Sequence, residues 1–369
     1  MDFSYSEEQR EILALANKIF QEQCTPDKQR ALESDPDADK IDRDLWRLVG
    51  EAGLLGTALS PKFGGMGFSY QELSLIFEEA GKTLPKIPLL PHTLAALTLE
   101  YADGNTHQAL LREAASGAIV LGAALAEHAS QDQLSPTTTA ELCDGQWQIT
   151  GSKLCVPFAT FTDKLLVSAT IPGGASLFLV DSNAKGLHHE SLRVSTPEPS
   201  FALTLDHVSA DLIGGTDILR FLVERYTVAL CSYQVGCIEA MTSMTASYVA
   251  EREQFNVKIG TFQAVGHRAA NCYIDVACLR LVTQQAVTLL NSGKDSETAV
   301  LVAKSWAGDT GHRVSYAAQH LHGGLGVDRD YPLWRYATYC KHNEINLGTS
   351  GYLLSVLGKR IAEGAFSIE

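Results

Sequence analysis

The chain has 369 residues, of which 45% are hydrophobic and 20% are charged. This length exceeds one ordinary core of about 100–200 residues, so two or three domains are expected, and the composition excludes wholesale disorder. The 43 acidic residues outnumber the 29 basic ones, which gives a formal charge of −14. Because nucleic acids bind to basic surfaces, this charge argues against a nucleic-acid-binding protein.

Targeting and metal-binding signals are absent from the sequence. Residues 1–12 are acidic and amphipathic, unlike a signal peptide, and the longest apolar run, residues 118–126, is too short to cross a bilayer. The 8 cysteines form no Cys-x-x-Cys pair and no Cys/His cluster, so they predict free thiols in a reducing compartment and no metal site. These features predict a cytoplasmic protein that does not bind membranes.

Helical periodicity runs through the first third of the chain. Ser6 and Gln9 form a capping-box pattern ahead of an apolar stripe that begins at Ile12. Two further amphipathic stretches, residues 45–55 and 71–84, flank a loop rich in glycine and proline. The pattern predicts an N-terminal helical domain, which we place at residues 1–117.

The middle third has the pattern of a β-domain. Phe201, Leu203 and Leu205 alternate with less apolar residues, as a half-buried strand requires. Short segments rich in β-branched and apolar residues are separated by turn residues and lie at 147–151, 164–171, 175–180 and 201–205. The pattern predicts a β-barrel or sandwich, which we place at residues 118–215.

Long helices return in the last third. Residues 217–252 contain no proline and only one interior glycine, Gly236. Further helices are expected at residues 262–290, 297–321 and 349–361. Because long helices with short connections pack antiparallel, we predict a four-helix bundle over residues 216–369. The expected fold class is therefore α+β, in the order helical domain, β-domain and helical bundle.

Three segments of the sequence narrow the range of functions that the chain could have. They are LWRLVGEAGLLGTALSPKFGGMGFSYQELSLIFEEAGKTL at residues 45–84, YVAEREQFNVKIGTFQAVGHRAANC at 248–272 and LHGGLGVDRDYPLWRYATYCKHNEINLGTSGY at 321–352. In this order and spacing they resemble the acyl-CoA dehydrogenase flavoprotein family over essentially the whole chain. The third segment also resembles subunits of heteromeric (α2β2) bacterial acyl-CoA dehydrogenases, such as those of steroid side-chain degradation.

The resemblance implies an enzyme that uses FAD to introduce an α,β double bond into an acyl-CoA thioester, with electron-transfer flavoprotein as the electron acceptor. A fixed cation at Arg252 suits the FAD pyrophosphate, and paired glycines let the backbone approach it closely. His320 stands where the family usually has glutamine. The residues at the family's cofactor-binding positions are Arg252, Gln254, Phe255, Phe262, Gln263, His320, Gly323, Gly324 and Thr349.

The position of the catalytic base departs from the family pattern. The chemistry needs a carboxylate to remove the α-proton of the thioester. In the family a glutamate usually stands directly before Gly-Thr-Ser, where this chain has Leu347; a second family position, counted back from Arg252, is Tyr226. Glu224 is the candidate base, although it lies roughly 200° around the helix from Tyr226 and a helix-start glutamate is also favoured by the helix dipole. Glu344, one turn before Leu347, is the other candidate.

The positions beside the flavin ring have changed as well. The resemblance places Ala126 where the family has a hydroxyl residue, and Cys155, Val156 and Pro157 where it has Trp-Ile-Thr. A chain that keeps the residues at the ADP half of FAD and loses those at the flavin ring resembles one member of a pair of unlike subunits. Three functions stay open: a subunit of a heteromeric acyl-CoA dehydrogenase, which we favour, a homo-oligomeric dehydrogenase that uses Glu224, and a non-catalytic scaffold or regulatory subunit. Flavin oxidases and oxygenases share the fold.

Overall fold

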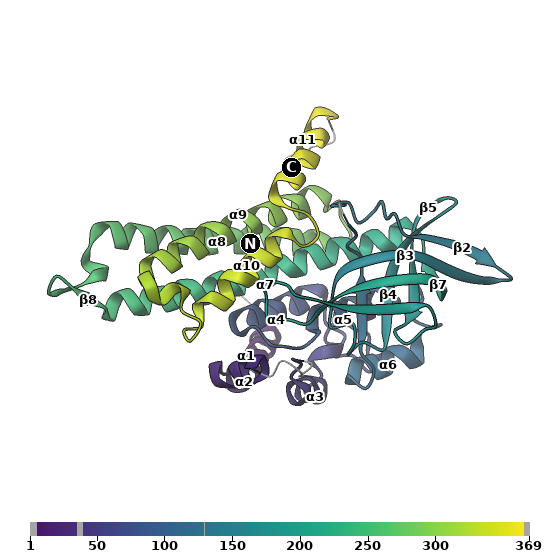
Figure 1. Ribbon diagram of the computed structural model, residues 1–369, viewed down its shortest axis with the longest axis horizontal. Coiled ribbons are helices and arrows are strands. Elements are labelled where there is room, and N and C mark those ends of the chain that lie inside the picture. Colours follow the sequence, from purple (N-terminus) through teal and green to yellow (C-terminus); the bar gives the residue numbers. More distant parts are fainter. Residues whose placement is uncertain (1–5, 35–39, 129, 365–369) are drawn as a thin grey trace. The chain divides into compact units, whose positions relative to one another are not determined.

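The computed structural model describes residues 6–34, 40–128 and 130–364, whose elements run in the order helices, strands, helices (Figure 1). This order confirms the predicted α+β fold with helical domains on either side of a β-domain. The described residues form two compact units: those that fall within 27–73 and 86–226 form one, and those that fall within 1–26, 74–85 and 227–369 form the other. The domain boundaries after residues 117 and 215 stay predictions.

The N-terminal helices begin where side chains cap them. Ser6 Oγ accepts a hydrogen bond from Gln9 N, and Gln9 Oε1 accepts one from Ser6 N, which confirms the predicted capping box. Asp42 Oδ1 caps the third helix by accepting from Leu45 N at 3.0 Å. The elements are α1 (Glu7–Gln23), α2 (Pro26–Ser34), α3 (Arg43–Glu51), η1 (Leu54–Gly56), η2 (Pro61–Phe63), α4 (Tyr70–Thr83), α5 (Leu89–Asp103) and α6 (Gln108–Ser116).

The middle third forms a closed β-barrel. Its strands are β1 (Leu121–Ala124), β2 (Thr139–Cys143), β3 (Gln146–Pro157), β4 (Lys164–Ile171), β5 (Gly174–Asp181), β6 (Leu187–Leu192) and β7 (Ser200–Gly214). The antiparallel pairs β2–β3, β3–β7, β7–β5 and β5–β4 form most of the ring, and the pairing of β4 with β2 closes it. Strand β1 adds to β4, and β6 adds to β7. Of the two predicted β architectures, the chain therefore adopts the barrel.

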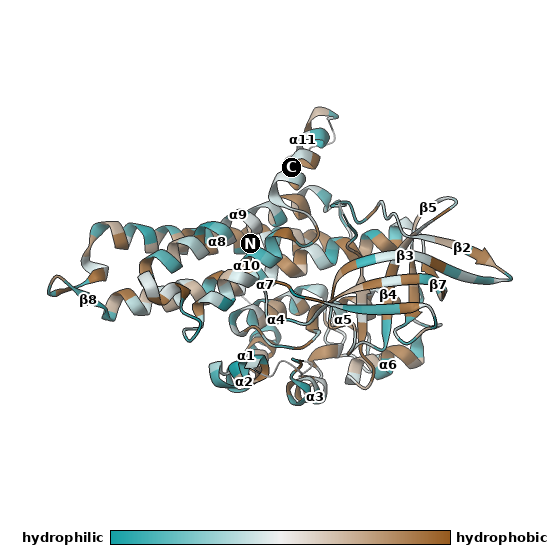
Figure 2. Cartoon of the chain, in the orientation of Figure 1, coloured by the Kyte–Doolittle hydropathy of each residue, from teal (hydrophilic) through white to brown (hydrophobic). Residues whose placement is uncertain are grey.

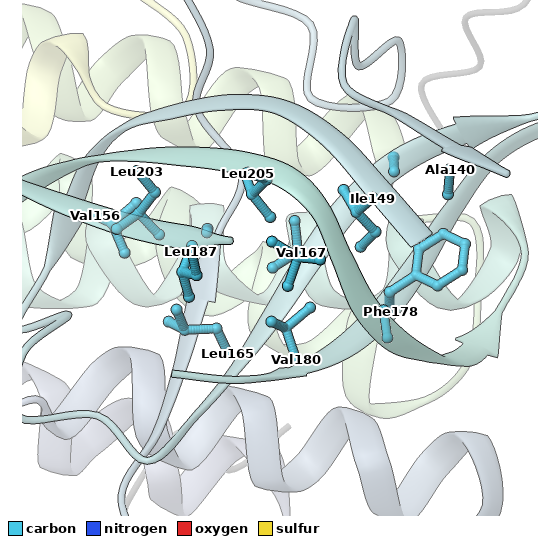
Figure 3. Close-up of a cluster of buried hydrophobic side chains, with 14 of the residues drawn as sticks. Ala140, Ile149, Val156, Leu165, Val167, Phe178, Val180, Leu187, Leu203 and Leu205 are labelled. Carbon is cyan, nitrogen blue, oxygen red and sulfur yellow. The ribbon is translucent and has the colours of Figure 1, made fainter. Parts of the chain in front are cut away.

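Apolar side chains from facing strands fill the barrel (Figure 3). Strands β2 and β3 carry both hydrophobic and hydrophilic residues, because one face of each strand lines this interior (Figure 2). The alternation predicted on β7 is confirmed by buried Leu203 and Leu205. The alternation then slips by one residue at His207, whose φ of 50° marks a bulge, so that Val208 and Ala210 continue the buried face.

A buried ion pair between Lys153 and Glu127 lies beside strands β3 and β4. Lys153 Nζ, on β3, donates to Glu127 Oε1 at 2.6 Å and to Ser168 Oγ on β4 at 2.8 Å, and its side chain is fully buried. Burial lowers the pKa of Lys153 to about 8. Burial opposes ionisation of Glu127 as well, but hydrogen bonds from Lys153 and Thr137 outweigh it and lower the pKa of Glu127 to about 2. Both groups are therefore charged at neutral pH.

The C-terminal helices match the predicted ranges to within one or two residues. They are α7 (Thr216–Glu251), α8 (Gln263–Asn291), α9 (Glu297–His322) and α11 (Ser350–Ala362). The helix α10 (Leu333–Ile345) was not predicted as a separate element. The short elements between them are β8 (Glu253–Gln254), β9 (Val257–Lys258), η3 (Ile259–Thr261) and η4 (Gly323–Val327).

The single interior glycine of α7 has a packing reason. A Cβ atom at Gly236 would lie 2.0 Å from the carbonyl oxygen of Glu78 on α4, and one at Gly81 on α4 would lie 2.0 Å from the carbonyl oxygen of Tyr233. Two helix backbones meet here with no side chain between them. Neither position therefore has room for any other residue.

We predict that Glu127→Gln strongly destabilises the barrel. The substitution leaves the Lys153 ammonium group buried without its counter-charge, which should lower the free energy of unfolding by about 3 kcal/mol. Urea unfolding followed by circular dichroism measures the change. Glu141→Gln, an exposed position on β2, is the control and should have little effect. Equal effects of the two substitutions would contradict the prediction.

Candidate functional site

The connection between α7 and α8 carries the first group of predicted cofactor-binding residues (Figure 1). Strands β8 and β9 form a hairpin that turns through Phe255 and Asn256, whose φ angles are 54° and 63°, as a two-residue hairpin turn requires. A hydrogen bond from Ile259 N to Arg252 O, at 2.8 Å, closes the base of the hairpin. This one connection holds the predicted residues Arg252, Gln254, Phe255, Phe262 and Gln263.

These residues are exposed to solvent. The Phe255 side chain is 89% exposed, and its ring meets that of Phe262 edge-on at 6.2 Å. The Arg252 guanidinium group forms no ion pair with any residue that the structure describes, whereas the neighbouring Lys258 pairs with Glu253 at 2.8 Å. An exposed aromatic ring and an uncompensated cation, unused by the chain itself, are typical of a binding surface.

The end of α9 carries the second group, His320, Gly323 and Gly324. Arg268 Nη1, on α8, donates to His320 Nδ1 at 2.6 Å. Because Nδ1 accepts this bond, a neutral His320 ring carries its proton on Nε2 and can donate it outward. Gly323 has a φ of 60°, and a Cβ atom at Gly323 or Gly324 would meet nothing within 4 Å. The glycine backbone is thus open to a ligand.

The two groups lie at the same end of the helices, but Thr349 does not. The ring of Tyr248, one turn before Arg252 on α7, stacks on His322 at 4.4 Å, which joins the end of α7 to the end of α9. Thr349 caps α11, where the adjacent Ser350 Oγ donates to the carbonyl oxygen of Ser305 at 3.1 Å. Ser305 and the end of α9 are separated by about 25 Å along the helix axis, at 1.5 Å per residue. The structure therefore separates Thr349 from the other predicted residues.

Among the described residues, each of the two units has a cavity. One of about 270 Å³ lies between α8 and α9 beside the Arg268–His320 pair, and its wall includes Asp275 and Tyr316. The other, of about 630 Å³, lies between α3 and the barrel and is lined by residues that include Arg43, Trp46 and Phe161. The larger cavity contains none of the predicted site residues.

The usual position of the base is filled by an apolar side chain. Leu347 lies in the connection between α10 and α11, is 6% exposed and has a φ of 55°. The nearby Glu344 pairs with Lys341, three residues before it. Position 347 therefore has no carboxylate. The nearby carboxylate of Glu344, on α10, is already engaged in an ion pair.

The second base position is occupied by a buried phenol. Helix α7 runs unbroken from Thr216 to Glu251, so Tyr226 lies on the helix that ends directly before Arg252. Tyr226 is 6% exposed, and burial raises its pKa, which keeps the phenol protonated. Glu224 is partly buried and lies roughly 200° away around the helix. Its role as a base stays a prediction.

Glu198 is a partly buried carboxyl group that the sequence did not single out. Burial raises its pKa to about 7, although the charge of Lys86 acts to lower it, and the Glu198 charge in turn raises the pKa of Tyr226. A hydrogen bond from Phe158 N to Pro199 O, at 3.0 Å, ties its segment to the end of β3. Glu198 therefore lies near both Tyr226 and the strand that the resemblance places at the flavin ring.

Unpartnered hydroxyls flank Glu198. Among the described residues, Thr196 Oγ1 and Ser200 Oγ are buried and form no hydrogen bond. Two prolines around Glu198 in the sequence TPEPS indicate a turn and give no sign of burial, so sequence reasoning missed this group. The ring-side residues themselves offer little polarity: Cys155 is exposed with a φ of 52°, and Pro157 has no N–H.

Within residues 6–34, 40–128 and 130–364, no cluster of three or more His, Cys, Asp or Glu side chains could hold a metal ion. No helix in the same part of the chain is long and apolar enough to span a membrane.

Comparisons with known proteins identify relatives of this chain. The sequence patterns of the acyl-CoA dehydrogenase N-terminal and C-terminal domains match residues 6–118 and 217–362. Acyl-CoA dehydrogenase FadE27 of Mycobacterium tuberculosis is 32% identical over 98% of this chain and 99% of its own. A Tcur3481–Tcur3483 steroid ACAD variant superimposes with a TM-score of 0.94 and 39% identity, covering 98% of this chain and 99% of that one. The ChsE4–ChsE5 complex of Mycobacterium tuberculosis gives 0.92 and 33%, with the same coverage.

We predict that Glu198→Gln changes stability in a pH-dependent way. Because the pKa of Glu198 is raised to about 7 from an ordinary 4.5, its contribution is fully present below about pH 4.5 and is lost as the pH rises through 7. Relative to the parent chain, the variant should gain roughly 1–3 kcal/mol of unfolding free energy between pH 4.5 and pH 8.5. Urea unfolding at several pH values measures this difference.

The control is Glu190→Gln, at an exposed position on β6. Its stability difference from the parent chain should not vary with pH over this range. A pH-independent difference for Glu198→Gln would show that the Glu198 carboxyl ionises as freely as an exposed one.

Proposed function

The chain belongs to the acyl-CoA dehydrogenase family, and from this premise we propose that it is one subunit of an FAD-dependent enzyme that introduces an α,β double bond into an acyl-CoA thioester. Family members are flavoprotein oxidoreductases and generally bind FAD. Homologues of known structure form heteromeric complexes, among them Tcur3481–Tcur3483 and ChsE4–ChsE5. Our proposal is that this chain pairs with a second, acyl-CoA dehydrogenase-like chain in an α2β2 assembly.

The residues at the shared end of α7, α8 and α9 fit the ADP half of FAD. Arg252 is an uncompensated cation for the pyrophosphate, and the open backbone at Gly323 and Gly324 suits close approach by phosphate or ribose. His320 Nε2 can donate a hydrogen bond on the adenosine side, and Phe255 and Phe262 offer apolar rings. These features support a cofactor-binding role for this end of the chain. Gln254 and Gln263, on the same connection, belong to the proposed set.

The positions for the chemistry of the acyl group do not match those of a self-sufficient enzyme. Removing the α-proton needs a carboxylate at the reacting carbon, and FAD, when bound, accepts the β-hydrogen as a hydride. Leu347 cannot accept a proton, and Tyr226 is a buried phenol whose raised pKa keeps it protonated. The chain has residues that suit the ADP half of FAD but no carboxylate at either family position for the base. This contrast is the observation that carries the proposal. The partner chain supplies the base, and this chain supplies the ADP-side contacts.

The same proposal covers the electron acceptor and the location of the protein. Electron-transfer flavoprotein would reoxidise the cofactor, and the enzyme would act on lipid or steroid acyl-CoA esters in the cytoplasm. Two other functions are outcomes of the tests below. They are a homo-oligomeric dehydrogenase with Glu224 as base, and a scaffold subunit with no part in catalysis.

We predict that Arg252→Ala weakens FAD retention by the assembled protein. Loss of the charge-assisted hydrogen bonds to the pyrophosphate should reduce affinity roughly 10- to 100-fold. The flavin-to-protein ratio after gel filtration measures the effect. Lys258→Ala is the control, because Lys258 lies on the same hairpin but is already paired with Glu253. An unchanged ratio in Arg252→Ala would mean that Arg252 is an ordinary surface residue.

We also predict that the lone chain is inactive and poorly flavinylated, and that coexpression with a homologue bearing a glutamate before Gly-Thr-Ser restores both properties. Loss of a general base typically costs about 10²–10⁴-fold in rate. Acyl-CoA-dependent dye reduction and the count of FAD per chain are the measurements, each repeated with Glu224→Gln.

The outcomes separate the three functions. Turnover by the pair that is indifferent to Glu224→Gln supports a base in the partner. Robust turnover by the lone chain that Glu224→Gln abolishes would replace the heteromer with a homo-oligomer. If the partner binds FAD and keeps full activity in the absence of this chain, only a scaffold role remains for this chain.

A further inference from the structure

Arg268 and His320 meet across two neighbouring helices. Arg268 lies in the second turn of α8 and His320 in the last turn of α9, and these helices pack against each other (Figure 1). Arg268 Nη1 donates to His320 Nδ1 at 2.6 Å. Arg268 is partly buried and His320 is exposed, so a partly buried cation holds an exposed ring.

This bond fixes which ring nitrogen of His320 carries the proton. A guanidinium group donates hydrogen bonds and cannot accept them, so Nδ1 must present its lone pair. The neutral ring then carries its hydrogen on Nε2. Among the described residues, Nε2 has no hydrogen-bond partner. The ring therefore offers a fixed donor that the chain itself does not use.

Tyr316 restrains the same ring. It lies one turn before His320 on α9, and the two rings are nearly parallel, at 14°, with their centres 6.4 Å apart. The guanidinium carbon of Arg268 lies 5.5 Å from the centre of the Tyr316 ring, within the range of a cation–π contact. These contacts leave the His320 ring less free to turn than an isolated exposed histidine would be.

Arg268 forms no ion pair with the residues that the structure describes. The next arginine contact between these helices is different, because Arg313 of α9 donates twice to Asp275 of α8, at 2.7 and 3.0 Å. That pair lies seven residues from the first along each helix, or about 10 Å at 1.5 Å per residue. An ion pair is sufficient to join the two helices. An arginine that bonds to a histidine instead indicates a role for the histidine ring.

The His320 ring lies among the residues proposed to bind the ADP half of FAD. Gly323, three residues after His320, has an open backbone, and Gln263 begins α8 five residues before Arg268. The ADP half of FAD carries acceptor atoms in its phosphates, its ribose and its adenine ring. A fixed donor suits such an acceptor, because a ring that turned freely would have to be ordered on binding.

We propose that Arg268 is a positioning residue: it holds the His320 ring so that Nε2 donates to the ADP half of FAD. This inference rests on the proposed function and deepens it, because it assigns a role to a residue outside the predicted cofactor-binding set. In this role Arg268 touches no cofactor atom and acts through His320.

The test is a double-substitution cycle in the assembled pair after its flavin has been removed. Titration with FAD, followed by flavin fluorescence, gives the affinities of the parent, Arg268→Met, His320→Gln and the double variant. With His320 in place, Arg268→Met should weaken binding about tenfold, as the loss of one hydrogen bond implies. A glutamine amide has its own N–H donors and needs no partner to fix a tautomer. In the His320→Gln background, Arg268→Met should therefore cost less than about twofold.

Equal losses from Arg268→Met in the two backgrounds would overturn the inference, because Arg268 would then act without His320. No loss in the parent background would overturn it as well. Arg313→Met is the control, because it breaks a contact between the same two helices without touching His320, and it should leave FAD affinity within about twofold. A loss as large as that of Arg268→Met would assign the effect to loosening of the helices and overturn the inference. A parent pair that binds no FAD at all would contradict the proposed function itself and the inference with it.

A second measurement separates positioning from direct attraction to the cofactor. A guanidinium group that attracted the phosphates of FAD would act through its charge, and salt screens such an attraction between exposed groups. A hydrogen bond from a neutral histidine ring is much less sensitive to salt. The loss caused by Arg268→Met should therefore be the same at low and high salt. A loss that fades at high salt would overturn the inference and make Arg268 a direct phosphate contact.

Discussion

The burial of lysine ammonium groups organises both units of this protein. A buried cation is tolerated only when nearby carboxylates or hydrogen-bond acceptors offset its charge. Lys153 meets this condition through Glu127 and Ser168 in the barrel wall, and Lys86 meets it through Glu33 at 2.8 Å. Lys304 meets it through backbone carbonyls alone. Each cation contacts a group that is distant in sequence, so each holds together segments that are far apart in the chain.

The electrostatics of the two units differ in a way that follows from these cations. In the barrel unit, the Glu127 carboxylate neutralises the buried Lys153, and the partly buried carboxyl group of Glu198 has a pKa raised to about 7. In the helical unit, Lys304 is instead stabilised by three backbone carbonyl oxygens at the end of α10 and in the connection to α11. The first environment favours a protonated carboxyl group, and the second stabilises a buried cation without a carboxylate.

Sequence patterns were sufficient for elements whose signal is local. The capping box at Ser6, the unbroken helix up to Glu251 and the strand alternation through Leu205 depend on neighbouring residues, and the structure has all three. Helix α10 was missed because it buries Arg335 and Asn343 together with apolar residues, so its buried face has no hydrophobic period. The slip in β7 was missed because a bulge is decided by the pairing of β7 with β3.

For the candidate site, too, the sequence located the residues that have a local signal and missed those whose role depends on distant segments. Family motifs located the residues around Arg252 and His320, which the structure brings to one end of the helices. They also included Thr349, which caps α11 and lies far from that end. Glu198 and Lys304 were invisible because their burial is produced by segments far away in the chain. A lysine within an amphipathic helix pattern is normally interpreted as solvent-exposed.

The contact between Gly81 and Gly236 has a consequence for the evolution and engineering of this chain. Where side chains separate two helices, a change on one helix can be absorbed by a compensating change on the other. Here the backbones of α4 and α7 touch directly, so there is no side chain whose size could be adjusted in return. Any sequence library built on this scaffold must leave both positions fixed, and adaptation of this crossing has to proceed through the residues around it.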